Sequence, residues 1–206
     1  MRHAGRVTEN LDAVVLAGGA ATRMGGADKP GLTVAGRTLL EHVVGAVRAH
    51  APHADVVVVG PERDSPRARY VREDPPGAGP VPALRTGLAL VRAERVALLA
   101  ADLPHLAPSH LADLRAALRG GAAGEAHGAV FVDATGREQW LTGVWDTAAL
   151  RAALDDYTGR SLHRLLGPLD PARVPLTGAP EEFDVDTPEA LDRARAAWTP
   201  GDSGRS

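Results

Sequence analysis

The sequence predicts a single α/β domain, with helices on both faces of a mostly parallel central sheet. Three observations lead to this fold class. Short apolar runs alternate along the chain with amphipathic stretches. A glycine-rich segment directly follows the first of those runs. The length of 206 residues suffices for one well-buried core, and no linker is long enough to separate two domains.

The first half of the chain alternates strands and helices. The apolar run AVVLA at 13–17 ends at two glycines and is typical of a buried central strand. Thr38 can cap a helix to about His50, because leucines and valines recur there at helical spacing. The pattern then predicts a strand at 55–60, a short strand at 70–74, a helix after the turn-rich segment 75–82 that continues to about Ala93, a strand at 96–101 and a helix at 108–119.

The second half predicts a sheet edge and three more helices. Strands at 128–133 and 139–145, joined by a turn, can pair as antiparallel neighbours. The remaining predicted elements are helices at 147–156 and 161–166, a short strand at 172–176 and a closing helix at 188–198. We expect a flexible N-terminus at 1–10, one domain at 11–198 and a flexible tail at 199–206.

Composition excludes several functional classes. A net charge of -3 and a pI near 6.2 argue against a broad basic face for nucleic acid. The absence of cysteine excludes disulfides, thiolate zinc sites and a cysteine nucleophile. The polar first ten residues lack a signal-peptide core, and the apolar runs are far shorter than a membrane span. We therefore expect a cytoplasmic protein.

Lys29 is the only lysine, beside 22 arginines. Lysine carries a compact point charge on a flexible stem, whereas arginine carries a wide planar fork. A crowded phosphate pocket can therefore require lysine, which makes Lys29 the first candidate for a functional cation.

The segment LAGGAATRMGGADKPGL at 16–32 follows the first strand and can bind phosphate. Its glycines, which include Gly18 and Gly19, allow backbone N–H groups to converge on an anion. Arg23 and Lys29 add positive charge, and together they can hold a nucleotide triphosphate. The spacing fits neither a Walker P-loop nor a dinucleotide fingerprint. A flexible loop without function is the alternative.

The pattern LAGG, RMGG and DK strongly resembles the nucleotide-diphospho-sugar transferase superfamily, and within it the molybdenum cofactor guanylyltransferases. The resemblance spans about 13–196 and implies a Rossmann-like nucleotidyltransferase fold. It also implies transfer of GMP from GTP to the terminal phosphate of molybdopterin, with release of pyrophosphate and with Mg²⁺ as cofactor. Carried over from the family, the residues at the base and ribose are Leu16, Ala17 and Gly18, and those at the phosphates are Arg23 and Lys29; Gly19 is expected to bind the nucleotide as well.

Asp102 stands where a buried strand ends, a position at which ligands gather in open α/β sheets. A carboxylate there is a natural magnesium ligand. The resemblance implies that Asp102, two residues before Pro104, holds the metal that bridges the nucleotide phosphates. Helix capping is the alternative role for this aspartate.

A second acidic pair, Asp184 and Asp186, precedes the last predicted helix in FDVDTPE. Strand alternation would place both on one face, and similar proteins carry this motif near the metal and the pterin. We favour Asp186 as second magnesium ligand and Asp184 as a substrate contact. An N-cap role for Asp186 or Thr187 is about equally supported.

The resemblance also assigns Asp74 to the nucleotide, before a turn that reads GPVPAL. Gly60 occupies the position at which some family members offer an asparagine, so that side-chain contact is missing here. Arg160, near a helix N-terminus, can bind the cofactor phosphate, although a solvated face explains it equally. The histidines show no metal-ligand spacing.

The predicted reaction is an in-line displacement in which an anionic phosphate attacks the α-phosphorus, so no general base is required. The alternatives are a molybdenum cofactor cytidylyltransferase, a phospholactate guanylyltransferase and a non-catalytic nucleotide-binding regulator. Expected partners are GTP, a molybdopterin-type cofactor, and other molybdenum cofactor biosynthesis proteins or molybdoenzymes. We expect a monomer or a weak homo-oligomer.

Overall fold

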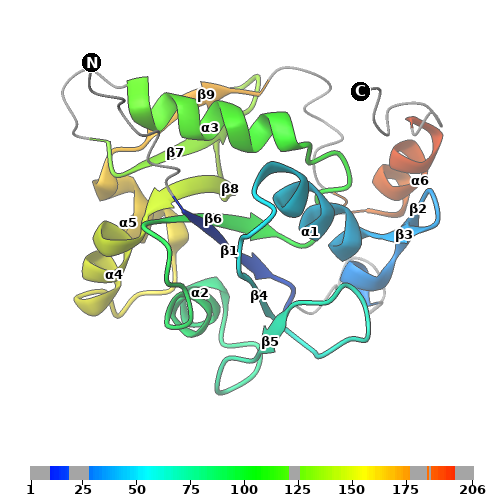
Figure 1. The fold of residues 1–206 in the computed structure, drawn as a ribbon, viewed down its shortest axis with the longest axis horizontal. Coiled ribbons are helices and arrows are strands. Elements are labelled where there is room, and N and C mark those ends of the chain that lie inside the picture. The colour runs from blue at the N-terminus through cyan, green and yellow to red at the C-terminus, as the bar shows by residue number, and fades with distance from the viewer. Residues whose placement is uncertain (1–9, 19–27, 121–125, 177–184, 186, 198–206) are drawn as a thin grey trace, which may run out of the picture.

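The computed structural model describes residues 10–18, 28–120, 126–176, 185 and 187–197. Within them, seven strands form one sheet in the order β5-β4-β1-β6-β8-β7-β9 (Figure 1). Their bounds are β1 (Leu11–Leu16), β4 (Val56–Val59), β5 (Arg69–Val71), β6 (Arg95–Ala100), β7 (Gly128–Val132), β8 (Glu138–Asp146) and β9 (Ala172–Pro175). The predicted α/β fold class is confirmed.

The sheet is parallel apart from one strand. β5, β4, β1 and β6 pair in parallel, and β7 pairs in parallel with β9. β8 runs antiparallel to both of its neighbours, β6 and β7. The carboxyl ends of β1, β4 and β6 therefore lie at one edge of the sheet, where ligands bind in folds of this kind.

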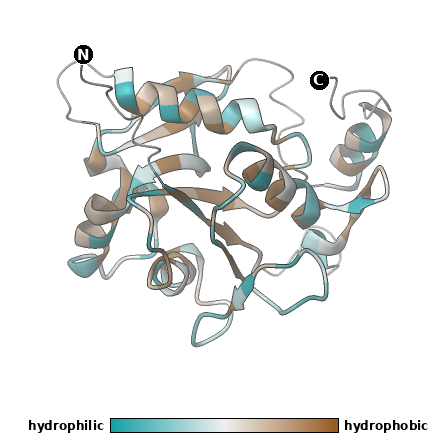
Figure 2. Cartoon of the chain, viewed as in Figure 1, coloured by the Kyte–Doolittle hydropathy of each residue, from teal (hydrophilic) through white to brown (hydrophobic). Residues whose placement is uncertain are grey.

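Helices cover both faces of this sheet, as predicted. α1 (Leu39–His50) and α3 (Pro108–Gly120) pack on one face. α2 (Pro80–Leu88), α4 (Thr147–Asp155) and α5 (Leu162–Leu166) pack on the other face, and the 3-10 turn η3 (Gly167–Leu169) follows α5. Figure 2 shows the hydrophobic residues concentrated along the strands, so the sheet supplies the centre of both cores.

The start of α1 is fixed by a reciprocal cap. The Thr38 hydroxyl accepts the N–H of Glu41 at 3.1 Å, and the Glu41 carboxylate accepts the N–H of Thr38 at 2.7 Å. Each side chain thus satisfies a backbone donor that the first turn of a helix leaves without a partner. The predicted helix from Thr38 to about His50 is confirmed.

The sequence pattern places the end of α2 incorrectly. The helix stops at Leu88 and not at about Ala93. The buried carboxylate of Asp12, on β1, accepts the N–H of Arg92 at 2.8 Å and that of Ala93 at 2.9 Å. These long-range bonds hold the 89–93 segment as a turn that leads into β6.

The structure contains a small hairpin that the sequence pattern does not predict. The 3-10 turn η2 (Lys29–Gly31) leads into β2 (Thr33–Val34), which pairs antiparallel with β3 (Arg37–Thr38). Val34 and Leu39 pack with Leu191 of α6 (Pro188–Ala197), and Val185 joins this third cluster. The hairpin therefore packs the segment that carries Lys29 against α6.

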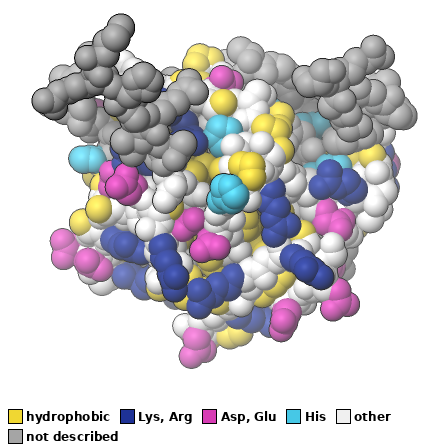
Figure 3. Space-filling model, in the orientation of Figure 1, with side chains coloured by type: hydrophobic (Ala, Val, Ile, Leu, Met, Phe, Trp, Pro, Cys, Tyr) yellow, Lys and Arg dark blue, Asp and Glu magenta, His cyan; other side chains and the backbone are white. Residues whose placement is uncertain are grey.

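Within the described ranges, no helix combines the length and the apolar character that a membrane crossing requires. On the face shown in Figure 3, basic side chains lie among acidic ones, and apolar side chains appear as separate small patches.

Candidate active site

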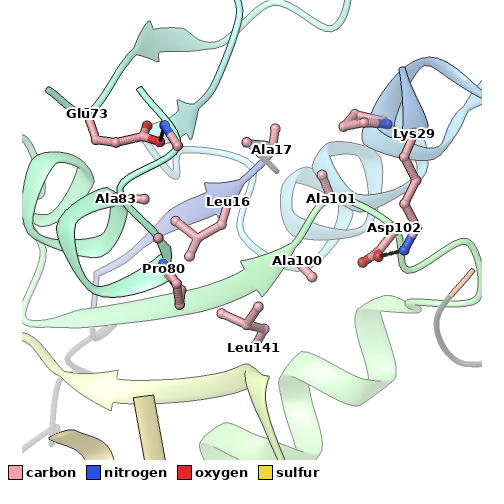
Figure 4. A pocket seen from close by; sticks show the side chains of 14 residues that line it. Leu16, Ala17, Lys29, Glu73, Pro80, Ala83, Ala100, Ala101, Asp102 and Leu141 are labelled. Atoms are coloured by element: carbon pink, nitrogen blue, oxygen red, sulfur yellow. Dashed lines mark hydrogen bonds and ion pairs between the residues drawn. The ribbon is translucent and has the colours of Figure 1, made fainter. Parts of the chain in front are cut away.

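A cavity of about 400 Å³ opens at the carboxyl ends of β1 and β6. The loop before α2, the first turn of α2 and the η2 turn form its other walls, and Leu141 of β8 closes one side (Figure 4). The volume suits a small-molecule ligand. The lining residues are Leu16, Ala17, Gly18, Lys29, Pro30, Glu73, Gly77, Gly79, Pro80, Ala83, Ala100, Ala101, Asp102 and Leu141.

α2 reaches this cavity because two glycines allow it. Gly79 precedes the helix with φ +110°, a conformation that side chains disfavour, and Pro80 begins the first turn. At Gly87, a Cβ would lie 2.6 Å from Val14 Cγ1 and 2.8 Å from Val59 Cγ2. Glycine at this position thus lets α2 lie directly on β1 and β4, with its N-terminus at the cavity.

Lys29 and Asp102 form an ion pair at one end of the cavity (Figure 4). Their side chains are 16% and 19% exposed, so both groups lie at the cavity mouth and not in the deep core. The Asp102 Oδ1 atom is buried and has no hydrogen-bond partner among the described residues. One carboxylate oxygen therefore remains available to a ligand or a cation.

Glu73 is a second carboxylate in the cavity, and sequence reasoning missed it. The residue is 5% exposed, and its Oε1 atom accepts the N–H of Gly77 at 2.8 Å. Its neighbour Asp74, which the sequence favoured, is exposed and is not among the lining residues. Both residues lie in a loop after β5, where no periodicity indicates which of two adjacent side chains points inward.

A second hollow of about 310 Å³ adjoins the first and shares Ala17, Gly18, Lys29 and Glu73 with it. Asp28 lies at its rim and is paired with Arg63, whose N–H donates to Asp28 Oδ2 at 2.6 Å. Hydrogen bonds from Arg63 lower the pKa of Asp28. The two hollows therefore lie next to each other at the ends of β1, β4 and β6.

Gly60 lines the second hollow at the end of β4. A Cβ at this position would lie 2.9 Å from the carbonyl oxygen of Ala17, closer than real Cβ contacts. An asparagine would therefore displace the backbone after β1. The close approach of two strand ends explains why this chain has glycine here.

The structure brings several sequence-predicted site residues together. Leu16, Ala17, Gly18, Lys29 and Asp102 all line the main cavity. Arg160 is exposed just before α5 and lies outside the cavity lining.

Four further predicted site residues fall outside the described residues, namely Gly19, Arg23, Asp184 and Asp186. Val185, between the last two, is buried, and its N–H donates to the Asp102 carbonyl oxygen at 3.1 Å. Val185 thus lies against the backbone of Asp102.

The cavity therefore has an apolar middle between two polar ends, the Glu73 carboxylate and the Lys29–Asp102 pair. Leu16, Ala83 and Leu141 supply apolar surface, and a cation with a carboxylate lies at one end. Such a site can take a ligand that joins a flat ring to an anionic group, which is the form of a nucleotide.

Comparison with known proteins agrees with this geometry. Residues 13–173 match the family described as MobA-like NTP transferase domain. The molybdenum cofactor guanylyltransferase of Bradyrhizobium sp. (strain ORS 278) is 40% identical over 121 residues, which cover 53% of this chain and 56% of that protein. The bifunctional protein GlmU of Xanthobacter autotrophicus (strain ATCC BAA-1158 / Py2) is 37% identical over 158 residues, which cover 71% of this chain and 35% of that protein.

Solved structures share the fold. The molybdopterin-guanine dinucleotide biosynthesis protein A of Archaeoglobus fulgidus superposes with a TM-score of 0.65 at 18% identity, covering 90% of this chain and 97% of that one.

The matched segments span 56% of the Bradyrhizobium relative and 35% of the Xanthobacter relative, about half or less of each protein. Because the family match covers most of the sequence, from 13 to 173, this chain belongs to the MobA-like NTP transferase domain family.

Proposed function

We propose that this protein is a magnesium-dependent nucleotidyltransferase that transfers GMP from GTP to the phosphate of molybdopterin or the molybdenum cofactor, releasing pyrophosphate. The observation that carries the proposal is the Lys29–Asp102 pair at the strand ends of a MobA-like domain. The name of the Bradyrhizobium relative supports the choice of nucleotide and of acceptor.

Lys29 is the cation for the phosphates in this proposal. Its ammonium group lies at the cavity mouth on Asp102, where the oxygens of an incoming triphosphate compete for it. Arg23, from the same glycine-rich segment, adds a second positive charge. Together the two cations stabilise the negative charge on the departing pyrophosphate.

Asp102 fits a divalent cation. Its Oδ1 atom is buried without a partner among the described residues, and Mg²⁺ commonly binds through one or two carboxylates together with substrate phosphates. Within the described part of the chain, no group of three or more His, Asp or Glu residues could hold a metal alone. We assign Asp186 as the second ligand and Asp184 as a substrate contact, which the Val185–Asp102 bond supports. Bound there, the ion would neutralise charge on the phosphates.

The acceptor requires little activation. A phosphate oxygen is already anionic, so the chain needs to orient it in line with the α-phosphorus and does not need to remove a proton. Arg160 is our candidate contact for the acceptor phosphate. Other molybdenum cofactor biosynthesis proteins or molybdoenzymes then bind the product.

Pyrophosphate release tests the proposal. The purified chain is incubated with magnesium, molybdopterin and each of GTP, CTP, ATP and UTP. The same assay is run on Lys29→Ala and on Arg119→Ala, which removes one exposed positive charge from the end of α3. We expect turnover with GTP alone, a loss of at least about 100-fold in Lys29→Ala, and wild-type activity in Arg119→Ala.

Other outcomes discriminate between the alternatives. Turnover with CTP in place of GTP would retain the transferase mechanism and reassign the nucleotide. Absence of turnover with all four nucleotides, in protein that is folded, would contradict the proposal and favour a nucleotide-binding regulator.

A further inference from the structure

Four arginines converge on a hollow at the end of the sheet opposite the active cavity. The hollow has a volume of about 360 Å³ and lies at the amino ends of β4 and β5, whereas the active cavity opens at the carboxyl ends of β1 and β6. Basic side chains gather in the lower half of the view in Figure 3, the part in which Figure 1 draws β4, β5 and α2. The arginines that line the hollow are Arg48, Arg67, Arg69 and Arg92, and all four are exposed.

The protein does not balance the charge of these guanidinium groups. Among the described residues, Asp55 supplies the only carboxylate of the lining. None of the four arginines forms an ion pair with a carboxylate in the part of the chain that the structure describes. Arginines elsewhere do pair, as Arg63 does with Asp28. Because like charges repel, the hollow attracts anions, and a bound anion would offset the repulsion.

Hydrogen bonds hold the backbone that carries these arginines. Arg48, near the end of α1, donates from its guanidinium to the Arg67 carbonyl oxygen. Arg69 is part of β5, which pairs with β4. The backbone N–H of Arg92 donates to the buried Asp12 carboxylate at 2.8 Å. The four side chains therefore extend from fixed positions, which reduces the conformational entropy that a ligand has to overcome.

The arrangement of the arginines indicates the chemistry of the ligand. A guanidinium group recognises phosphate through paired N–H donors. These four groups come from α1, from β5 and the segment before it, and from the turn before β6, and they surround one compact hollow. A ligand that contacts all of them needs several negative charges in a small volume. Di- and triphosphate groups meet this need better than a single phosphate, which has fewer oxygens for four guanidinium groups.

We propose that this hollow binds the di- or triphosphate group of a small molecule, as a second anion site separate from the active cavity. Free pyrophosphate and nucleoside triphosphates both carry such a group. The inference does not depend on the proposed function, because the hollow and the active cavity share no lining residue among those that the structure describes.

Calorimetric titration with pyrophosphate tests the proposal. Titrations are made in EDTA, without magnesium, on the full chain and on Lys29→Ala, which lacks the lysine of the active cavity. Two pairs of substitutions are then added to Lys29→Ala. One pair is Arg69→Gln with Arg92→Gln. The matched control is Arg137→Gln with Arg193→Gln, which removes the same charge from exposed positions outside the hollow.

We expect Lys29→Ala to bind pyrophosphate, and the Arg69→Gln and Arg92→Gln pair to weaken that binding by roughly 10- to 100-fold. The control pair should keep the dissociation constant of Lys29→Ala. The side chains of Arg69 and Arg92 make no hydrogen bond within the described residues, so the melting temperature should stay unchanged. If it falls, Arg67→Gln replaces the pair and should also weaken binding.

Titration of the same chains with GTP distinguishes the two sources of the phosphate group. If the Arg69→Gln and Arg92→Gln pair also weakens GTP binding, the hollow accepts a phosphate chain that a nucleotide carries. If the pair leaves GTP binding unchanged while it weakens pyrophosphate binding, the ligand is free pyrophosphate.

Several results would overturn the proposal. Absence of pyrophosphate binding in Lys29→Ala would exclude the hollow as a diphosphate site and leave the proposed function intact. Unchanged binding in the Arg69→Gln and Arg92→Gln pair would exclude these residues. Equal weakening by the two pairs would show a general attraction to positive charge. Binding of a glutamate-rich peptide, lost in the first pair and not matched by pyrophosphate, would reassign the hollow to an acidic partner protein.

Discussion

Under the proposed function, the Lys29–Asp102 ion pair would have a role in both the empty and the ligand-bound cavity. With no ligand in the cavity, each charge compensates the other at its mouth. Under the proposed function, the nucleotide phosphates would bind the Lys29 ammonium group, and Asp102 would hold the divalent cation. The pair is partly exposed, so its separation costs little and its charges are placed for binding more than for stability.

Asp102→Asn tests the role of this carboxylate in the reaction separately from its role in stability. We expect kcat/KM for pyrophosphate release to fall by about 100-fold or more, because a neutral amide binds a divalent cation more weakly than a carboxylate does. The free energy of unfolding should change by no more than about 1 kcal/mol, as for other partly exposed ion pairs. Steady-state kinetics and urea unfolding measure the two effects. A variant with wild-type kcat/KM would remove Asp102 from the site.

At the scale of the element, α2 is the part of the fold whose placement determines the cavity. Its first turn and the preceding Gly79 form one wall, and Gly87 lets its other end lie against Val14 and Val59. The valine methyl groups at this contact belong to stiff, β-branched side chains that cannot move aside. Close packing of one helix on the sheet therefore controls the shape of the cavity.

Gly87→Ala tests this packing. The added methyl group should displace α2, lower the free energy of unfolding by about 1–3 kcal/mol and weaken GTP binding. Thermal unfolding and nucleotide titration report the two changes. Gly167→Ala is the matched control, because its backbone is helical and a Cβ there meets nothing within 4 Å. Equal effects of the two substitutions would show that the close contact at Gly87 does not determine the position of α2.

The elements that the sequence predicts correctly are those that local patterns determine. β1 ends in the continuous apolar run AVVL, β4 is apolar throughout, and α1 has its cap and apolar stripe within one stretch of chain. The early end of α2 depends on Asp12, far away in sequence, and each strand of the β2–β3 hairpin is too short to show periodicity.

The residues of the candidate site also divide into those that a local sequence pattern indicates and those that it does not. Leu16 to Gly18, Lys29 and Asp102 could be found, because glycine-rich loops and strand ends have local signatures. Glu73 could not be distinguished from Asp74, because only the three-dimensional course of the β5–α2 loop buries one of them.

At the scale of the whole molecule, the direction of the strands determines where the cavity lies. A buried histidine affects the stability of the fold. Four adjacent parallel strands bring their carboxyl ends to one edge, where the cavity opens. Elsewhere, His42 lies buried on α1 with its Nε2 atom 2.9 Å from the Val34 carbonyl oxygen. Burial lowers the pKa of His42 below its ordinary value of 6.5.

This shift predicts that acid destabilises the fold. Below about pH 6.5 the unfolded chain protonates His42 more readily than the folded chain does, so stability falls as pH decreases toward the folded-state pKa. The slope from this residue is at most about 1.4 kcal/mol per pH unit. Urea unfolding between pH 5 and 8 should show it, and His42→Gln should flatten the profile. An identical profile in the variant would contradict the assignment.

Isotope labelling tests whether this chain transfers a nucleoside monophosphate. The protein is incubated with magnesium, molybdopterin and GTP that carries ³²P at either the α or the γ position. We expect the α label in the pterin product and the γ label in pyrophosphate. Transfer of the γ label to the acceptor, or release of the α label only as free GMP, would contradict nucleotidyl transfer.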